Sequence, residues 1–254
     1  MTAVASASSA LPSRRDEDWR YSDIAAVERA WPVAAEAIDI AAGDHARRMI
    51  VQDAAIGSAT IRQLAITLAA GARLDLHIIN SGGAYGRVAL DVTLHQGAHF
   101  ELGGVIIARG EQVLEIIATV RHAGPGASSN QIVRCVAGGT ATATYLGKVA
   151  VARAGQKTDA AQSFKALLLD RGATANAKPE LEIFADDVKC AHGATVGELD
   201  KTALFYLESR GLPPATARAL LTRAFLSDAL ASIADDAARE AAEAQVTALL
   251  EAAL

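Results

Sequence analysis

Residues Ile61 to Leu94, IRQLAITLAAGARLDLHIINSGGAYGRVALDVTL, decide the fold. Apolar side chains take every second position in three runs of this stretch. The runs are Leu64, Ile66 and Leu68, then Leu74, Leu76 and Ile78, then Val88, Leu90, Val92 and Leu94. Period-two alternation places such side chains on one face of a β-strand and leaves the opposite face for polar residues. Each run is therefore predicted to be a half-buried strand.

Turns of small residues separate the runs and recur along the chain, at Gly71-Ala72, Gly97-Ala98, Gly126-Ala127, Gly139-Thr140, Gly172-Ala173 and Gly193-Ala194. Most intervals between them are about twenty to thirty residues, a period that repeat architectures use. No helix-period segment stands between the strands, whereas a doubly wound sheet needs a crossover helix of about a dozen residues. The sequence favours a mainly β fold of stacked coils, a β-helix. A β-sandwich is the alternative, because alternation and glycine turns occur there too.

Three parts follow from this pattern. Residues 1–60 are predicted to be a flexible tail and an N-terminal arm, 61–198 the β-helix core, and 199–254 a C-terminal helical domain. In the arm, Trp19 and Tyr21 are expected either to dock on the body or to contact a partner.

Helical signals begin after the last strand pattern. Asp200 is suited to cap a helix that Gly211 ends, and Pro213-Pro214 resets the chain for a second helix. Apolar residues then recur at helical spacing to the end of the chain. These helices are expected to pack on one another or to cap the end of the β-helix, with leftover apolar surface as a docking face.

Composition excludes several classes of function. A net charge of −5 without a basic stripe argues against a nucleic-acid partner. The N-terminus has neither a signal-peptide pattern nor an apolar span of about twenty residues, so we expect a cytoplasmic protein without a membrane segment. The two cysteines do not resemble a disulfide framework. No P-loop is present, so this chain is not expected to hydrolyse ATP by the P-loop mechanism. The dinucleotide fingerprint of a Rossmann fold and the HExxH motif are absent as well.

The residue types that carry chemistry gather at Lys189-Cys190-Ala191-His192-Gly193. If this segment is extended, Cys190 and His192 share one face, together with Asp186. Thiolate and imidazole are soft ligands that suit iron, iron–sulfur species or zinc. Two ligands do not complete a tetrahedral site, so the others must come from elsewhere in this chain or from another chain. The structural alternative is a buried cysteine and a hydrogen-bonded histidine at a turn. Cys135, in an apolar strand, is expected in the core.

The same region carries a family resemblance. The segment from Glu180 to Phe225, ELEIFADDVKCAHGATVGELDKTALFYLESRGLPPATARALLTRAF, is similar to the C-terminal core of the SufB/SufD family of iron–sulfur cluster assembly proteins. Its run DDVKCAHGATVGELD resembles the SufD branch. Upstream, Gln162 with Phe164 to Leu169, Lys178 to Glu180 and Arg15 to Tyr21 also resemble the family pattern.

The resemblance implies a right-handed parallel β-helix followed by a helical domain. It also implies a scaffold that is not itself an enzyme, with a SufB-like scaffold as partner and a SufC-like ABC ATPase on the C-terminal helices. ATP would then bind only to the partner ATPase. His192 matches the SufD histidine proposed to join SufB side chains at the nascent cluster, and Cys190 is its neighbour. Both are therefore candidate metal and cofactor ligands, for a transient iron–sulfur cluster or iron at the partner interface.

The chain differs from the family in length, and two other functions are compatible with its sequence. Family members are often longer, so a reduced N-terminal region with fewer coils is expected. A β-helical enzyme acting on carbohydrate or acyl substrates would need a groove of acids and histidines, for which Asp75, Asp91, His77 and His95 are the candidates. A homodimeric interaction module with a structural cysteine and histidine is the third possibility.

Overall fold

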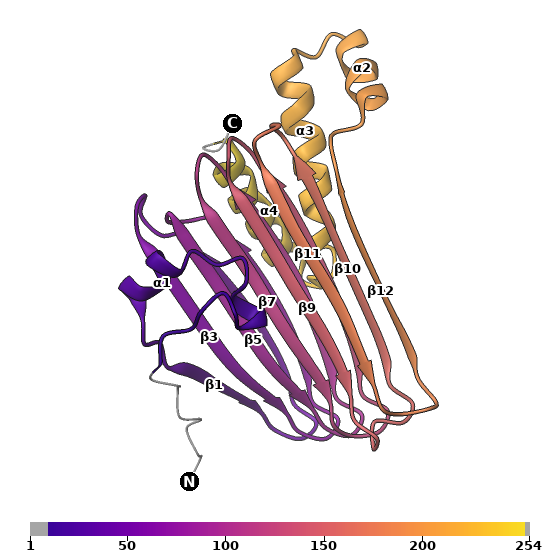
Figure 1. The fold of residues 1–254 in the computed structure, drawn as a ribbon. Helices are drawn as coiled ribbons and strands as arrows, with labels where there is room; N and C mark the ends of the chain where they lie inside the picture. Colours follow the sequence, from indigo (N-terminus) through magenta and orange to yellow (C-terminus); the bar gives the residue numbers. More distant parts are fainter. Residues whose placement is uncertain (1–9, 252–254) are drawn as a thin grey trace.

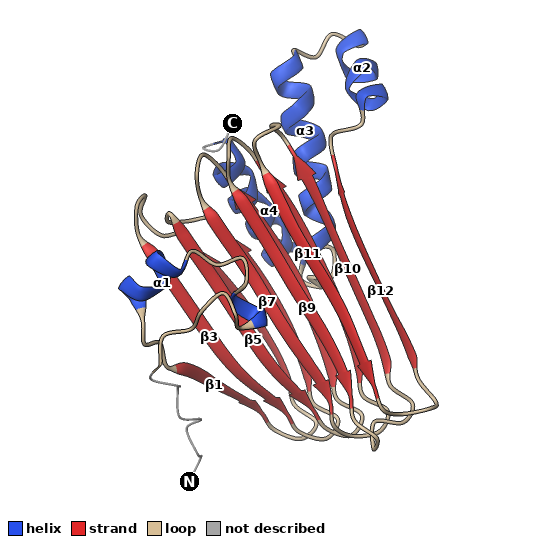
Figure 2. Ribbon diagram, viewed as in Figure 1, coloured by secondary structure: helices blue, strands red, loops and turns tan. Residues whose placement is uncertain are grey.

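The computed structural model describes residues 10–251, and Figure 2 shows that parallel strands dominate it. The strands are β1 (Ala35–Ile40), β2 (His45–Gln52), β3 (Ala59–Leu68), β4 (Arg73–Asn80), β5 (Tyr85–Leu94), β6 (His99–Ala108), β7 (Val113–His122), β8 (Ser128–Ala137), β9 (Thr142–Val151), β10 (Asp159–Leu168), β11 (Thr174–Ile183) and β12 (Lys189–Gly197). The three runs of alternation quoted above lie in β3, β4 and β5, as predicted.

The strands form two six-stranded sheets between which the chain passes back and forth. Sheet A has the order β1-β3-β5-β7-β9-β11, and sheet B has the order β2-β4-β6-β8-β10-β12. One strand of each sheet makes one coil, so the solenoid has six coils, and every neighbouring pair is parallel. Parallel stacking confirms the predicted parallel β-helix and excludes the β-sandwich, whose strands are antiparallel.

The core lies between the two sheets. The apolar residues Leu64, Ile66 and Leu68 of β3 belong to one continuous buried cluster with the inward residues of β4, which are Leu74, Leu76 and Ile78. Burying a side chain of this size stabilises the fold by roughly 1.5–3 kcal/mol. Cys135 is fully buried in the same cluster, as expected.

Positive φ angles occur at four of the predicted turn glycines, Gly71, Gly97, Gly126 and Gly139, because the chain reverses there in the left-handed region that glycine tolerates. Gly193 differs. It lies inside β12, so the prediction of a turn at Gly193-Ala194 was wrong.

Helices lie at both ends of the described chain. They are the 3-10 helix η1 (Glu17–Trp19), α1 (Ile24–Ala30), α2 (Lys201–Ser209), α3 (Pro214–Ser227), the 3-10 helix η2 (Asp228–Leu230) and α4 (Asp236–Glu251). Asp200 caps α2 by accepting from the backbone N–H groups of Thr202 and Ala203, as predicted. Gly211 has φ +91° after α2, and Pro214 begins α3.

Most of the C-terminal helical region packs on the side of the solenoid. Ile79, Val105 and Val136 point outward from sheet B, and the apolar faces of α3, η2 and α4 cover them. Arg134 of β8 adds an ion pair to Asp228 of η2, with 2.6 Å between Nη2 and Oδ2. The helices therefore cover the outer face of sheet B rather than capping the end of the solenoid. In Figure 1, α2 extends beyond the ends of the strands.

The N-terminal arm crosses the outer face of sheet A. Trp19 lies under the guanidinium of Arg87, 3.7 Å from the ring centroid, whereas Tyr21 is exposed. Docking on the body is thus the observed role of Trp19.

The solenoid begins at Ala35, so β1 and β2 fall within the range 1–60 that the sequence assigned to the arm. Alternation is weak there because β2 is an edge strand with exposed charges at Arg47 and Arg48. The predicted flexible tail, Met1 to Ser9, lies outside the described residues. Within residues 10–251, no helix has the length and apolar character that crossing a bilayer requires.

Candidate functional site

Cys190 and His192 lie in β12, the last strand of sheet B. In the parallel pairing of β12 with β10, Cys190 is opposite Ala160 and His192 is opposite Gln162. Ala160 and Gln162 are buried and point into the solenoid. The two candidate ligands therefore share the inner face of the sheet, as predicted, at the end where the stack of coils stops.

The two side chains differ in exposure. Cys190 is half-buried against Val188 and the apolar residues at the β9–β10 end of the core, and His192 is exposed. Burial raises the pKa of the Cys190 thiol above its ordinary value, and the nearby carboxylate of Asp159 acts in the same direction. The thiol is accordingly a weak ligand in the isolated chain, while the imidazole is accessible.

The charged neighbours of this pair belong to the turn before β12. Asp186 lies in the bend ahead of Lys189, where β12 begins, so the expectation that it shares the face of the two ligands was wrong. Asp187 forms an ion pair with Lys157 and accepts the backbone N–H of that residue at 2.6 Å. Lys189 is exposed. Asp187 therefore joins the turn before β12 to the turn before β10.

The donor set in this chain is incomplete. Across residues 10–251, no three histidine, cysteine or acidic side chains converge to hold a metal ion. An imidazole and a thiol fit iron by their chemistry, but a tetrahedral centre needs more donors. The ligand roles of His192 and Cys190 therefore stay predictions.

Polar residues line the core next to Cys190 and His192. Two of them, Gln131 and Tyr145, were not identified from the sequence. Gln131 of β8 is the register partner of Gln162, and both are buried. Tyr145 of β9 donates its hydroxyl hydrogen to Oε1 of Gln131 at 3.1 Å. A signal was present in the sequence, since a polar residue recurs at one strand position in β8, β10 and β12, but the strand register needed to see it is a property of the fold.

The last coil is open and partly apolar. Among residues 10–251, β11 pairs only with β9 and β12 only with β10, so each has one edge that no described strand pairs with. Ile183, Phe184 and Val196 are exposed there, with Phe184 at 60%. The first coil is different, because exposed charges such as Arg47 and Arg48 protect β2 against pairing with another strand. The unpaired edges with exposed apolar side chains are therefore at the end that carries His192.

The residues of the alternative enzymatic groove do not converge. Asp75 lies on the outer face of sheet B, where Arg73 Nε and His45 Nε2 each approach its carboxylate to 2.8 Å. Burial opposes its charged form, but these hydrogen bonds lower the pKa of Asp75 overall.

The other members of that set have partners of their own. His77, on the same face, lies 2.9 Å from Ser232 Oγ. Asp91 is on sheet A and pairs with Arg121, and His95 is exposed at a turn. Asp75 and His77 share the outer face of sheet B and line one pocket, whereas Asp91 lies on sheet A and His95 in a turn, so the four residues do not come together.

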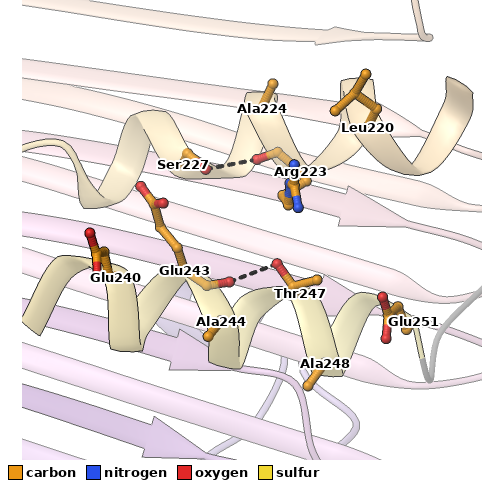
Figure 3. A pocket seen from close by; sticks show the side chains of 10 residues that line it. All are labelled: Leu220, Arg223, Ala224, Ser227, Glu240, Glu243, Ala244, Thr247, Ala248 and Glu251. Atoms are coloured by element: carbon orange, nitrogen blue, oxygen red, sulfur yellow. Dashed lines mark hydrogen bonds between the residues drawn. The ribbon is translucent and has the colours of Figure 1, made fainter. Parts of the chain in front are cut away.

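The helical region presents two surfaces. Phe205 and Tyr206 of α2 are 71% and 56% exposed, and α2 has no buried residue. A groove of about 630 Å³ lies between α3 and α4. In Figure 3, Arg223 of α3 lies on the side of the groove that faces the acidic residues of α4. The acidic residues that line it are Glu240, Glu243 and Glu251.

Comparison with protein families agrees with this geometry. The family described as "SUF system FeS cluster assembly, SufBD core domain" matches residues 21–225. That range contains the whole solenoid, the pair at β12 and α2.

Individual relatives agree as well. An iron–sulfur cluster assembly SufBD family protein of Synechocystis is 38% identical over 174 residues, which is 68% of this chain and 38% of that protein. A chloroplastic protein of Arabidopsis thaliana, ABCI7, is 34% identical over 79% of this chain and 42% of its own length. The SufD protein of Escherichia coli is 29% identical over 71% of this chain and 43% of its own length.

This chain thus spans about two fifths of the length of each of these three relatives. The prediction of the family is confirmed, and two of the relatives, from Escherichia coli and Plasmodium falciparum, are named SufD. The chain belongs to the SufBD family of iron–sulfur cluster assembly proteins.

Proposed function

We propose that this chain is a SufD-like scaffold subunit of an iron–sulfur cluster assembly complex. It pairs with a SufB-like scaffold through the open coil of β11 and β12, and it docks a SufC-like ABC ATPase on its C-terminal helices. The cluster is cargo that forms at the interface, and this chain performs no catalysis of its own. A cytoplasmic location is part of the proposal.

The observation that carries the proposal is the position of His192. Its imidazole is exposed on the inner face of the last strand, so any chain that continues the solenoid covers it. A partner there also supplies the ligands that this chain lacks. Cys190 is the second candidate ligand, and its raised pKa favours a protonated thiol until a metal or a cationic partner group approaches.

Edge pairing supports the partner assignment. An unpaired parallel edge with small, mostly uncharged side chains is a template for another strand. β12 reads KCAHGATVG, with a single lysine, and nearly all of it is exposed. A SufB-like chain that adds a strand here buries Val196 and places its own donors over His192.

The helices support the second partner. α2 has no buried side chain and exposes Phe205 and Tyr206, the residue types that anchor protein interfaces. An ATPase bound to α2 lies at the same end of the solenoid as the last strand of sheet B, because β12 leads directly into α2. Movement of the ATPase can therefore act on the open coil.

The test uses the reconstituted complex with its SufB-like and SufC-like partners. We expect His192→Ala to abolish most cluster formation while the three subunits still co-purify. His95→Ala, which removes another exposed histidine far from β12, is the matched control and should behave as wild type. A wild-type cluster yield in the His192→Ala complex refutes the ligand role. Recovery of a stable homodimer of this chain in place of the complex refutes the partner assignment.

A further inference from the structure

The inner face of sheet B changes from apolar to polar along one column of register partners. The column begins with Arg48 at the open edge of β2, and from β4 to β12 it reads Leu76, Leu102, Gln131, Gln162 and His192. The positions in β4 and β6 fill the core with leucine, and the later ones place amides in the same location. Polarity therefore rises toward the exposed imidazole.

Gln162 is the neighbour of His192 in this column, and its carboxamide is only half used. The side chain is 4% exposed. Its Nε2 donates to the backbone carbonyl of Glu180 at 3.4 Å, while its Oε1 has no hydrogen-bond partner among residues 10–251. A buried carbonyl oxygen without a donor is unfavourable, so this acceptor is suited to a donor that arrives at the open end.

The opposite sheet keeps space for this amide. A side chain at Gly147 of β9 would place its Cβ 2.4 Å from Oε1 of Gln162 and 2.5 Å from Oη of Tyr145. Glycine at this position therefore leaves room for the carboxamide of Gln162 in the core. Adjacent strands are about 4.8 Å apart, which brings the side chains of a register pair within hydrogen-bonding reach.

We propose that Gln162 is a positioning residue for His192. Its Oε1 accepts the N–H of one imidazole nitrogen, and the lone pair of the other nitrogen then points out of the open coil toward the cargo. Histidine ligands generally donate their second N–H to such an acceptor, which fixes the tautomer and the ring orientation. A carbonyl oxygen has two lone pairs, so Gln131 can donate to the same atom. This inference rests on the proposed ligand role of His192.

The test reads the imidazole directly and needs no cluster. The full chain is labelled with ¹⁵N, and two-bond proton–nitrogen correlation spectra are recorded at about pH 8.5, where histidines of ordinary pKa are neutral. These spectra show which ring nitrogen carries the hydrogen, and the His192→Ala spectrum assigns the signals. In Gln162→Leu we expect the tautomer ratio of His192 to change about fivefold, the factor given by a net hydrogen bond of about 1 kcal/mol.

Three variants make the test specific. Leucine at position 162 repeats the residue of Leu76 and Leu102 in the same column, so Gln162→Leu should fold. Gln162→Glu retains an acceptor oxygen, and its carboxylate should favour the same tautomer at least as strongly as the wild-type amide does. Gln131→Leu, one strand further away, should keep the wild-type ratio.

The outcomes separate this inference from the proposed function. An unchanged ratio in Gln162→Leu overturns the positioning role, and so does an equal change in Gln131→Leu. The cluster yield of the His192→Ala complex is measured independently. A changed ratio with a wild-type yield in His192→Ala means that the contact exists but the ligand role fails.

Discussion

Arg87 and Glu115 form an ion pair beneath the N-terminal arm, with 2.7 Å between Nη1 and Oε2. The two side chains are only 2% and 1% exposed, although both lie on the outer face of sheet A. Arg87 also donates to the backbone carbonyl of Asp18 at 2.9 Å and stacks on Trp19. The N-terminal arm therefore covers this buried ion pair.

Removing the cation should destabilise the fold and release the arm. We expect Arg87→Ala to lower the free energy of unfolding by about 3–5 kcal/mol, because Glu115 is left buried without its partner. Urea denaturation and limited proteolysis near Trp19 measure the two effects. Arg121→Ala, which breaks the exposed pair with Asp91 on the same sheet, should change the stability by less than about 1 kcal/mol. Equal effects of the two substitutions contradict this account.

Acid should destabilise the protein through His122. This side chain is fully buried, with Nε2 3.0 Å from Ser129 Oγ, and burial lowers its pKa to about 4. Between about pH 6.5 and 4 the unfolded chain binds a proton at His122 that the folded chain does not bind, so stability falls as the pH falls.

The size of this loss is measurable by substitution. From about pH 7 to pH 5, the wild type should lose about 2 kcal/mol more of its unfolding free energy than His122→Gln, which has no group titrating in this range. Urea denaturation at the two pH values makes the comparison. The same pH dependence in both proteins would show that His122 is not the group responsible.

Gly147 should tolerate no side chain. Its Cβ would lie 2.4 Å from Oε1 of Gln162, so Gly147→Ala should destabilise the chain by about 1–3 kcal/mol through overpacking. Gly193→Ala in β12 is the control, since no atom of the described residues lies within 4 Å of the added Cβ, and its effect should stay within about 0.5 kcal/mol. Thermal or urea denaturation of the isolated chain distinguishes the two. A neutral Gly147→Ala means that the amide column is more loosely packed than described.

Phe205 should be a hot spot for the ATPase. Its 71% exposure in α2 leaves a large aromatic surface uncovered, and truncation of such anchors typically weakens binding by about 2 kcal/mol or more. We expect Phe205→Ala to reduce the affinity for a SufC-like ATPase about thirtyfold in a direct binding assay. Ile56→Ala, at a 94% exposed position far from α2 in the sequence, should leave the affinity unchanged. An unaffected Phe205→Ala places the docking surface elsewhere.

The coils could be predicted from the sequence where one face of each strand lies in the core. In β3 to β5 the inner face is core, so Leu64 and Leu74 stand in clean alternation. In β2 one edge is open, and Arg47 and Arg48 break the pattern, which is why the first coil was assigned to the arm. Helix packing on sheet B was also missed, because the outward apolar residues of that sheet are visible only once the register is known.

The candidate site could be predicted only in part, because the strand register is not known from the sequence. Alternation within a single strand is enough to place Cys190 and His192 on one face. Gln131 and Gln162 lie in other coils, and their alignment with His192 depends on the pairing of three strands. Asp186 was misplaced because the strand begins at Lys189, and a strand boundary is set by turn contacts such as that of Asp187 with Lys157.

The measurement that tests the central claim most directly is nitrogen hyperfine coupling in the assembled complex. This chain alone is labelled with ¹⁵N-histidine, combined with its unlabelled partners, and the reduced paramagnetic cluster is examined by pulsed electron paramagnetic resonance. Ligation by His192 predicts a ¹⁵N coupling that His95→Ala retains and His192→Ala loses. A cluster that forms in full without any ¹⁵N coupling, or a coupling that persists in His192→Ala, contradicts the account.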